Sequence, residues 1–135
     1  MKTEQILNLD FRKEENKEII QKVLRKIKPL SKYSDEEVPL EAIEKTIKVL
    51  TNKYDIMPQW MGMNYQEPVL GIYSIGVKTA SSHEWIGNVY GMCVYEVFAK
   101  LAIKMYADVK KGRVKQRVAT KEEKQRERKL KQVKG

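Results

Sequence analysis

The chain has 135 residues, of which 41% are apolar, and a formal net charge of +9 at pH 7. This length favours a single domain with a modest core. Charged and polar residues interrupt every apolar run before the roughly 20 residues that a membrane-spanning helix needs. We also expect no signal peptide, because no charged and then apolar leader begins the sequence. The single cysteine excludes an internal disulfide and favours a reducing, cytoplasmic setting.

The charge is distributed unevenly along the chain. Residues 1–109 contain 15 basic and 15 acidic side chains, whereas residues 110–135 contain 12 basic and only 3 acidic ones. The whole excess of positive charge therefore belongs to the C-terminal end. We predict a helical domain over residues 1–112 and a basic C-terminal arm over residues 113–135, called the basic arm below. A segment of this kind is typical of an interaction tail.

Two amphipathic helices are predicted in the first half of the chain. Residues 1–11 form an apolar lead-in or a short strand, and the first helix follows over residues 11–28, ending before Pro29. The second helix begins after Ser34, which has the capping-box spacing to Glu37, and runs to about Tyr54. Each carries one apolar stripe at helical spacing, which indicates a single buried face. The stripes consist of Ile19, Ile20, Val23, Leu24 and Ile27, and of Leu40, Ile43, Ile47, Leu50 and Tyr54.

Residues 55–80 are rich in proline and glycine and fit two structures. Residues 69–77 are β-branched and aromatic, which favours a small β element, although a helix that begins at Pro68 also fits. A cluster of methionine and aromatic residues lies in and beyond this region, and Met-rich surfaces adapt well to protein partners. Core packing is the more common use of such residues. The candidate protein-binding residues are Trp60, Met61, Met63, Tyr65 and Trp85.

The longest predicted element is a helix over residues 82–111. Ser81 and Glu84 have the spacing of a capping box, and Gly112 is suited to end the helix. The helix would be apolar on nearly all sides, so it would be buried at the centre of the fold or shared between subunits. Gly87 and Gly91 would allow another backbone to approach closely, which makes a homodimer possible. The polar exception is a ladder with four-residue steps, made of Glu96, Lys100, Lys104 and Asp108.

These elements predict a mainly α fold. We expect a three-helix core with a long central C-terminal helix, a possible small β element at residues 69–77, and a basic tail that is helical or disordered. The tail has too few apolar residues to form a core-facing stripe, and isolated helices of its length are marginal.

The basic arm suits the neutralisation of phosphates. Each Lys or Arg that pairs with a backbone phosphate releases condensed counterions, and arginine adds a planar fork of donors. No aromatic residue lies in the arm to stack on a base, so we expect non-specific binding of DNA or RNA. An acidic protein partner and a solvated tail without a partner are the two alternatives for this segment. The candidate nucleic-acid-binding residues are Arg113, Lys115, Arg117, Lys121, Lys124, Arg126, Arg128, Lys129 and Lys131.

Catalytic and metal-binding patterns are absent from the sequence. One histidine, His83, and one cysteine, Cys93, do not supply the ligands of a zinc site. On one helix these two residues would lie about 15 Å apart, too far for a nucleophile and its base. We expect His83 at the surface and Cys93 in the core. No phosphate-binding loop, dinucleotide motif or nucleophile elbow occurs either.

The sequence therefore predicts a non-enzymatic, nucleic-acid-associated protein that requires no cofactor. The alternative is a small protein that binds a larger one, such as an inhibitor or adaptor of a nucleic-acid-processing machine of the phage or mobile-element type. Neither alternative involves a membrane. The first uses the basic arm. The second uses the methionine and aromatic cluster, with the arm lying along an acidic or nucleic-acid-bound groove of the larger protein.

Overall fold

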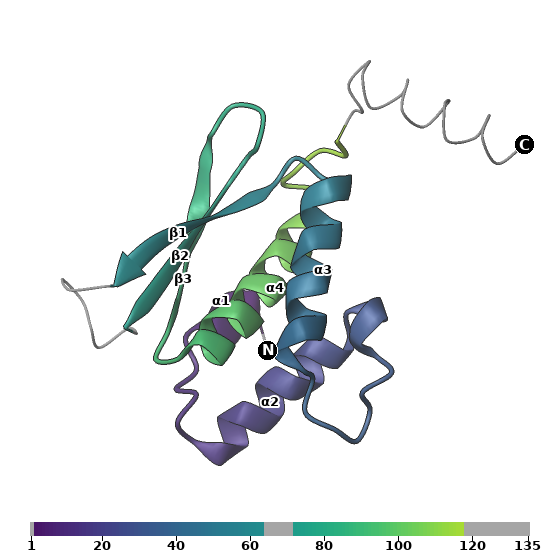
Figure 1. Ribbon diagram of the computed structural model, residues 1–135, viewed down its shortest axis with the longest axis vertical. Helices are drawn as coiled ribbons and strands as arrows, with labels where there is room; N and C mark the ends of the chain where they lie inside the picture. The colour runs from purple at the N-terminus through teal and green to yellow at the C-terminus, as the bar shows by residue number, and fades with distance from the viewer. Residues whose placement is uncertain (1, 64–71, 118–135) are drawn as a thin grey trace, which may run out of the picture.

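The computed structural model describes residues 2–63 and 72–117, and its helices lie on one side of a three-stranded antiparallel sheet (Figure 1). The prediction of a mainly α, three-helix core is therefore wrong, and the fold is mixed. In chain order the elements are α1 (Thr3–Leu7), α2 (Glu14–Arg25), the 3-10 turn η1 (Lys28–Leu30), α3 (Leu40–Lys53), β1 (Met57–Met63), β2 (Tyr73–Lys78), β3 (Trp85–Gly91) and α4 (Val94–Lys110).

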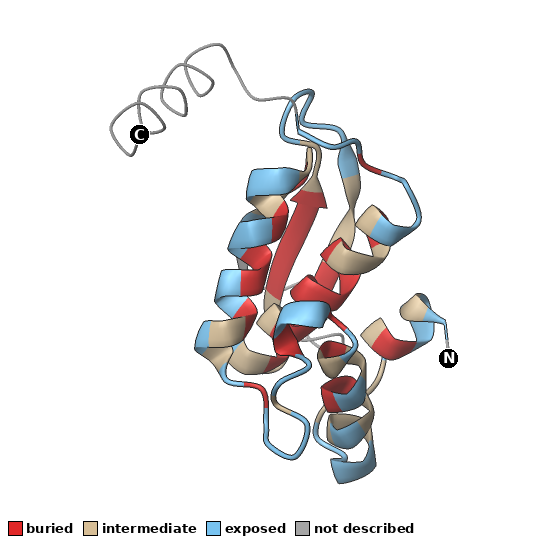
Figure 2. Ribbon diagram, turned by 90° about the vertical axis from the view of Figure 1, so that its right-hand side faces the viewer, coloured by how far each residue is buried: buried red, intermediate tan, exposed pale blue. Residues whose placement is uncertain are grey.

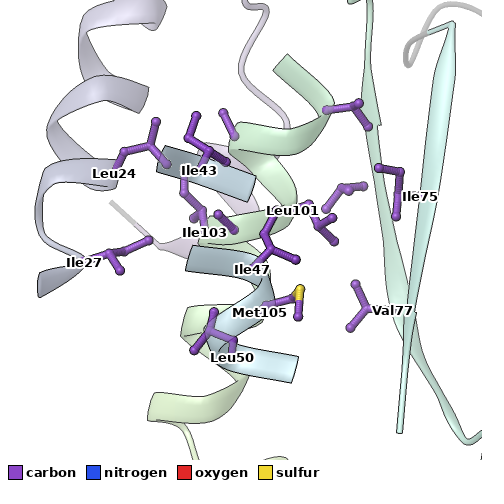
Figure 3. Packing of buried hydrophobic residues seen from close by; sticks show 14 of the residues in the cluster. Leu24, Ile27, Ile43, Ile47, Leu50, Ile75, Val77, Leu101, Ile103 and Met105 are labelled. Carbon is purple, nitrogen blue, oxygen red and sulfur yellow. The ribbon is translucent and has the colours of Figure 1, made fainter. Parts of the chain in front are cut away.

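The sheet has the strand order β1-β2-β3, so β2 is central. Ile75 and Val77 of β2 are buried and point toward Leu101 and Met105 of α4 (Figure 3). Val89 of β3 pairs with Ile75 and is also buried. Alternate residues of a strand point to opposite faces, so one face of the sheet packs on the helices. The extended interpretation of the glycine-rich region is confirmed where β2 lies.

The predicted apolar stripes of the first two helices form the opposite side of the core. Leu24 on α2 and Ile43 and Leu50 on α3 are buried in one cluster with α4 (Figures 2 and 3). α2 ends at Arg25, and η1 begins just before Pro29, as the predicted stop at proline requires. α3 begins at Leu40 after Pro39, which means that Ser34 caps no helix.

The predicted helix over residues 82–111 is wrong in its first third. Residues 85–91 form β3, and α4 begins at Val94 with Cys93 as its N-cap residue. Ser81 does not cap a helix, because its backbone N–H and its hydroxyl group both donate to Asp55. The predicted end is confirmed: α4 stops at Lys110, and Gly112 has a left-handed φ of 71°.

Gly87 and Gly91 do allow a close approach, but within one chain. A Cβ atom at Gly87 would lie 2.9 Å from Cε of Lys104, and a Cβ atom at Gly91 would lie 2.6 Å from the backbone nitrogen of Val97. Both glycines thus lie where α4 packs on β3. The close approach that suggested a homodimer is therefore used inside the subunit, and dimerisation stays a prediction.

The polar ladder of α4 is buried. Lys100 donates to Oε2 of Glu96 at 2.7 Å, and Lys104 pairs with Asp108 at 3.2 Å. Lys100 also donates to the carbonyl oxygen of Leu9 at 2.9 Å, from the segment that follows α1. The N-terminal region therefore packs against the polar side of α4 as an apolar lead-in, made of a short helix and a following loop, and not as a short strand, the other predicted alternative.

Within residues 2–63 and 72–117, no helix combines the length and the apolar character needed to cross a membrane.

Candidate nucleic-acid interface

The first five residues of the basic arm, residues 113–117, form a segment that we call the arm root. It folds back along the end of α3: the backbone N–H of Asp55 donates to the Lys115 carbonyl at 2.8 Å, and that of Arg117 donates to the Lys53 carbonyl at 2.8 Å. Val114 is buried beneath this contact. The arm root is therefore a fixed part of the body, although the predicted boundary placed it in the arm.

Asp55 connects the arm root to the β2–β3 turn, residues 79–84. Its carboxylate accepts the backbone N–H of Ser81 at 2.8 Å and the Ser81 hydroxyl at 2.6 Å. The hydrogen bond from the Ser81 side chain is the main reason that the pKa of Asp55 is lowered, and the charge of Arg117 contributes in the same direction. The carboxylate is therefore ionised at neutral pH and holds the turn against the end of α3.

The three described cations of the arm root have different surroundings. Arg113 pairs with the buried carboxylate of Asp108 at 3.3 Å, so part of its charge stabilises the body. Lys115 and Arg117 are exposed and line a pocket of about 400 Å³ between the arm root and the β2–β3 turn. Both side chains face solvent beside the point where the arm begins, and the charge of Arg117 also acts on Asp55.

The remaining candidate cations of the arm lie outside the described residues. They are Lys121, Lys124, Arg126, Arg128, Lys129 and Lys131. The prediction of a helical or disordered tail falls on the same region. What the described residues establish is the place where this segment leaves the body, next to the β2–β3 turn (Figure 1).

The candidate protein-binding residues are not on one surface. Trp60 is opposite Ile75 in the β1–β2 register, so it points to the helix side of the sheet, where its ring lies 5.7 Å from that of Tyr73. Trp85 packs against Gly76, on the face of the sheet that is opposite the helices. Both indoles are about half exposed, at 52% for Trp60 and 47% for Trp85. Met61 and Met63 belong to β1, and Tyr65 lies outside the described residues.

His83 and Cys93 occupy opposite ends of β3, a strand about 20 Å long at the usual rise per residue. His83 is exposed, as predicted, but it lies in the β2–β3 turn with φ 56°. Cys93 is exposed, and the prediction of a core cysteine is wrong. It caps α4 instead, because its sulfur accepts the backbone N–H of Glu96. Across the described residues, no three His, Cys, Asp or Glu side chains gather as a metal site would require.

Sequence reasoning missed Asp55 and Ser81, which position the arm root. Ser81 has the right spacing to Glu84 for a helix cap, and this local signal concealed its partner 26 residues away. No local pattern indicates the pairing of Tyr54 with Gln116. Comparisons with protein-family models, with curated proteins and with solved structures found no match to this chain.

Proposed function

We propose that this protein binds nucleic acid without catalysis, through phosphate contacts made by the basic arm. The observation that carries the proposal is the charge distribution: residues 1–109 are neutral, and residues 110–135 hold the entire excess of nine positive charges. Phosphate neutralisation by clustered Lys and Arg is the sequence-independent part of nucleic-acid affinity.

The arm root supports the proposal in a second way. Hydrogen bonds to Lys53 and Asp55 fix the point from which the arm leaves the body, while Lys115 and Arg117 stay exposed beside it. A fixed origin limits the volume that the arm can explore and so raises its effective concentration at a nucleic acid already in contact with the body.

A larger protein is the second candidate partner. The half-exposed Trp60, in contact with Tyr73 on the helix side of the sheet, favours it, because tryptophan is enriched among the residues that contribute most to the affinity of protein interfaces. This surface is separate from the arm root, so the two proposals can be tested with different substitutions.

The arm is tested with a full-length variant in which six of its cations are replaced by Gln. We expect this variant to bind a labelled single-stranded or duplex DNA of mixed sequence on the order of 100-fold or more weakly at low salt, because each lost phosphate contact removes counterion release. Fluorescence anisotropy measures the affinity. The replaced residues are Lys121, Lys124, Arg126, Arg128, Lys129 and Lys131.

A matched control separates the arm from total charge. Six exposed lysines of the body are changed to Gln, which lowers the net charge by the same amount. These residues are Lys13, Lys22, Lys26, Lys28, Lys32 and Lys48. The proposal requires that this control bind nearly as well as the unmodified chain. Equal losses in both variants would show that only net charge matters, and the arm would then have no special role.

A further inference from the structure

The side of the sheet that faces away from α3 and α4 is not covered by any described helix (Figure 1). Gly76 and Lys78 of β2 alternate with the buried Val77 and therefore point to this side. Trp85 of β3 pairs with Lys78 and lies over Gly76. We call these three residues the open sheet face.

Trp85 is held in place and is still accessible. A Cβ atom at Gly76 would lie 2.1 Å from Cη2 of the Trp85 ring, so the indole occupies the space that a side chain at this position would fill. An aromatic side chain that covers a glycine on a neighbouring strand is a known way to fix both. Because 47% of Trp85 remains exposed, the fixed ring also presents a surface to solvent.

The open sheet face lies at the same end of the molecule as the arm root. Trp85 directly follows the β2–β3 turn, which is closed by the hydrogen bond from Thr79 N–H to the Glu84 carbonyl. Asp55 bonds to Ser81 in this turn and to Lys115 in the arm root. Asp55 therefore links the turn that precedes Trp85 to the arm root, from which the basic arm begins.

We propose that the nucleic acid bound by this protein is single-stranded, and that one of its bases stacks on Trp85. The proposal rests on the proposed function and names the substrate class. Bases in a duplex are already stacked and paired, whereas those of a single strand are free to stack on an aromatic side chain. Lys78, which pairs with Trp85 in the strand register, adds a positive charge to the same face of the sheet.

The test uses tryptophan fluorescence. The chain has two tryptophans, so Trp60→Phe leaves Trp85 as the only source of tryptophan emission. We expect a single-stranded dT oligonucleotide of about 16 nucleotides to quench this emission as it binds, and a duplex of equal length to bind more weakly. In the full-length chain, Trp85→Ala should weaken binding of the single strand by about 5- to 100-fold, the range of one lost stacking contact.

Three comparisons make the result specific to stacking. Trp60→Ala, on the other face of the sheet, should leave the affinity unchanged, and Trp85→Phe should recover part of the loss. Trp85→Ala should also keep the salt dependence of the unmodified chain, because stacking releases no counterions. Circular dichroism of each variant checks that the fold is retained.

Failure of this inference differs from failure of the proposed function. If Trp85→Ala binds the single strand as tightly as the unmodified chain while the arm variant loses binding, the stacking proposal is overturned and the phosphate-binding arm stands. If the unmodified chain binds neither single-stranded nor duplex DNA, both proposals fail. Binding of duplex as tight as that of the single strand also contradicts the inference.

Discussion

Lys100→Met should lower the free energy of unfolding by about 3–5 kcal/mol, because it leaves the buried carboxylate of Glu96 without its cation. The side chains of Lys100 and Glu96 are only 4% and 3% exposed, and 2.7 Å separates their charged atoms. Lys100 also holds the Leu9 carbonyl, so its loss releases the segment after α1. Urea denaturation followed by circular dichroism measures the change.

An exposed ion pair with the same sequence spacing provides the control for this prediction. Glu41 and Lys45 on α3 have the same spacing and order, but their side chains are 79% and 76% exposed. Lys45→Met should therefore cost less than about 1 kcal/mol. Adding Glu96→Gln to Lys100→Met should restore much of the stability, since an amide still accepts the Met92 N–H and carries no charge. Equal effects at Lys100 and Lys45 would contradict the burial of the ladder.

Gly91→Ala should destabilise the fold by about 3 kcal/mol, at the upper end of the usual cost of overpacking. The added Cβ would lie 2.6 Å from the backbone nitrogen of Val97 and 2.8 Å from its Cα, so α4 itself would have to move away from β3. A flexible side chain could yield at little cost, but a helix backbone cannot. Thermal and urea unfolding of the purified variant measure the loss.

Whether Gly91→Ala lowers or raises the free energy of unfolding distinguishes the strand β3 from the predicted helix. Inside a helix over residues 82–111, Gly91→Ala would stabilise the protein by up to about 1 kcal/mol, since alanine is the better helix former. Gly112→Ala is the control, because a Cβ there meets nothing within 4 Å and only the left-handed φ opposes it. If the Gly91 variant were as stable as the unmodified chain or more so, the packing of α4 on β3 would be wrong.

Periodicity predicted the parts of the fold that depend on nearby residues. The stripes of α2 and α3, the stop before Pro29 and the end of α4 at Gly112 each follow from side chains within a few turns. The prediction of a helix over residues 85–91 failed because this segment is stabilised by pairing with β2, which the local sequence does not reveal. The need for glycine at positions 87 and 91 likewise comes from the packing of α4 on β3. Tertiary contacts decide such short apolar segments.

The candidate interface also has one part that the sequence predicts and one part that depends on contacts between distant residues. Counting charges along the sequence locates the basic arm, because the imbalance is a property of adjacent residues. The place where the arm is attached depends on pairing between Tyr54 and Gln116 and on the bonds from Asp55 to Ser81 and Lys115. These partners are far apart in the chain and carry no shared motif. The open sheet face was missed because Trp85 was assigned to a helix.

The salt dependence of single-stranded DNA binding tests the role of the basic arm most directly. The affinity of the full-length chain is measured between roughly 50 and 200 mM salt, beside the variant with six arm cations replaced by Gln. If the arm pairs with six phosphates, the logarithm of the binding constant should fall with the logarithm of the salt concentration with a slope of about −4, and the variant should lose most of this slope. A slope near zero in the unmodified chain, or an unchanged slope in the variant, would contradict phosphate binding by the arm.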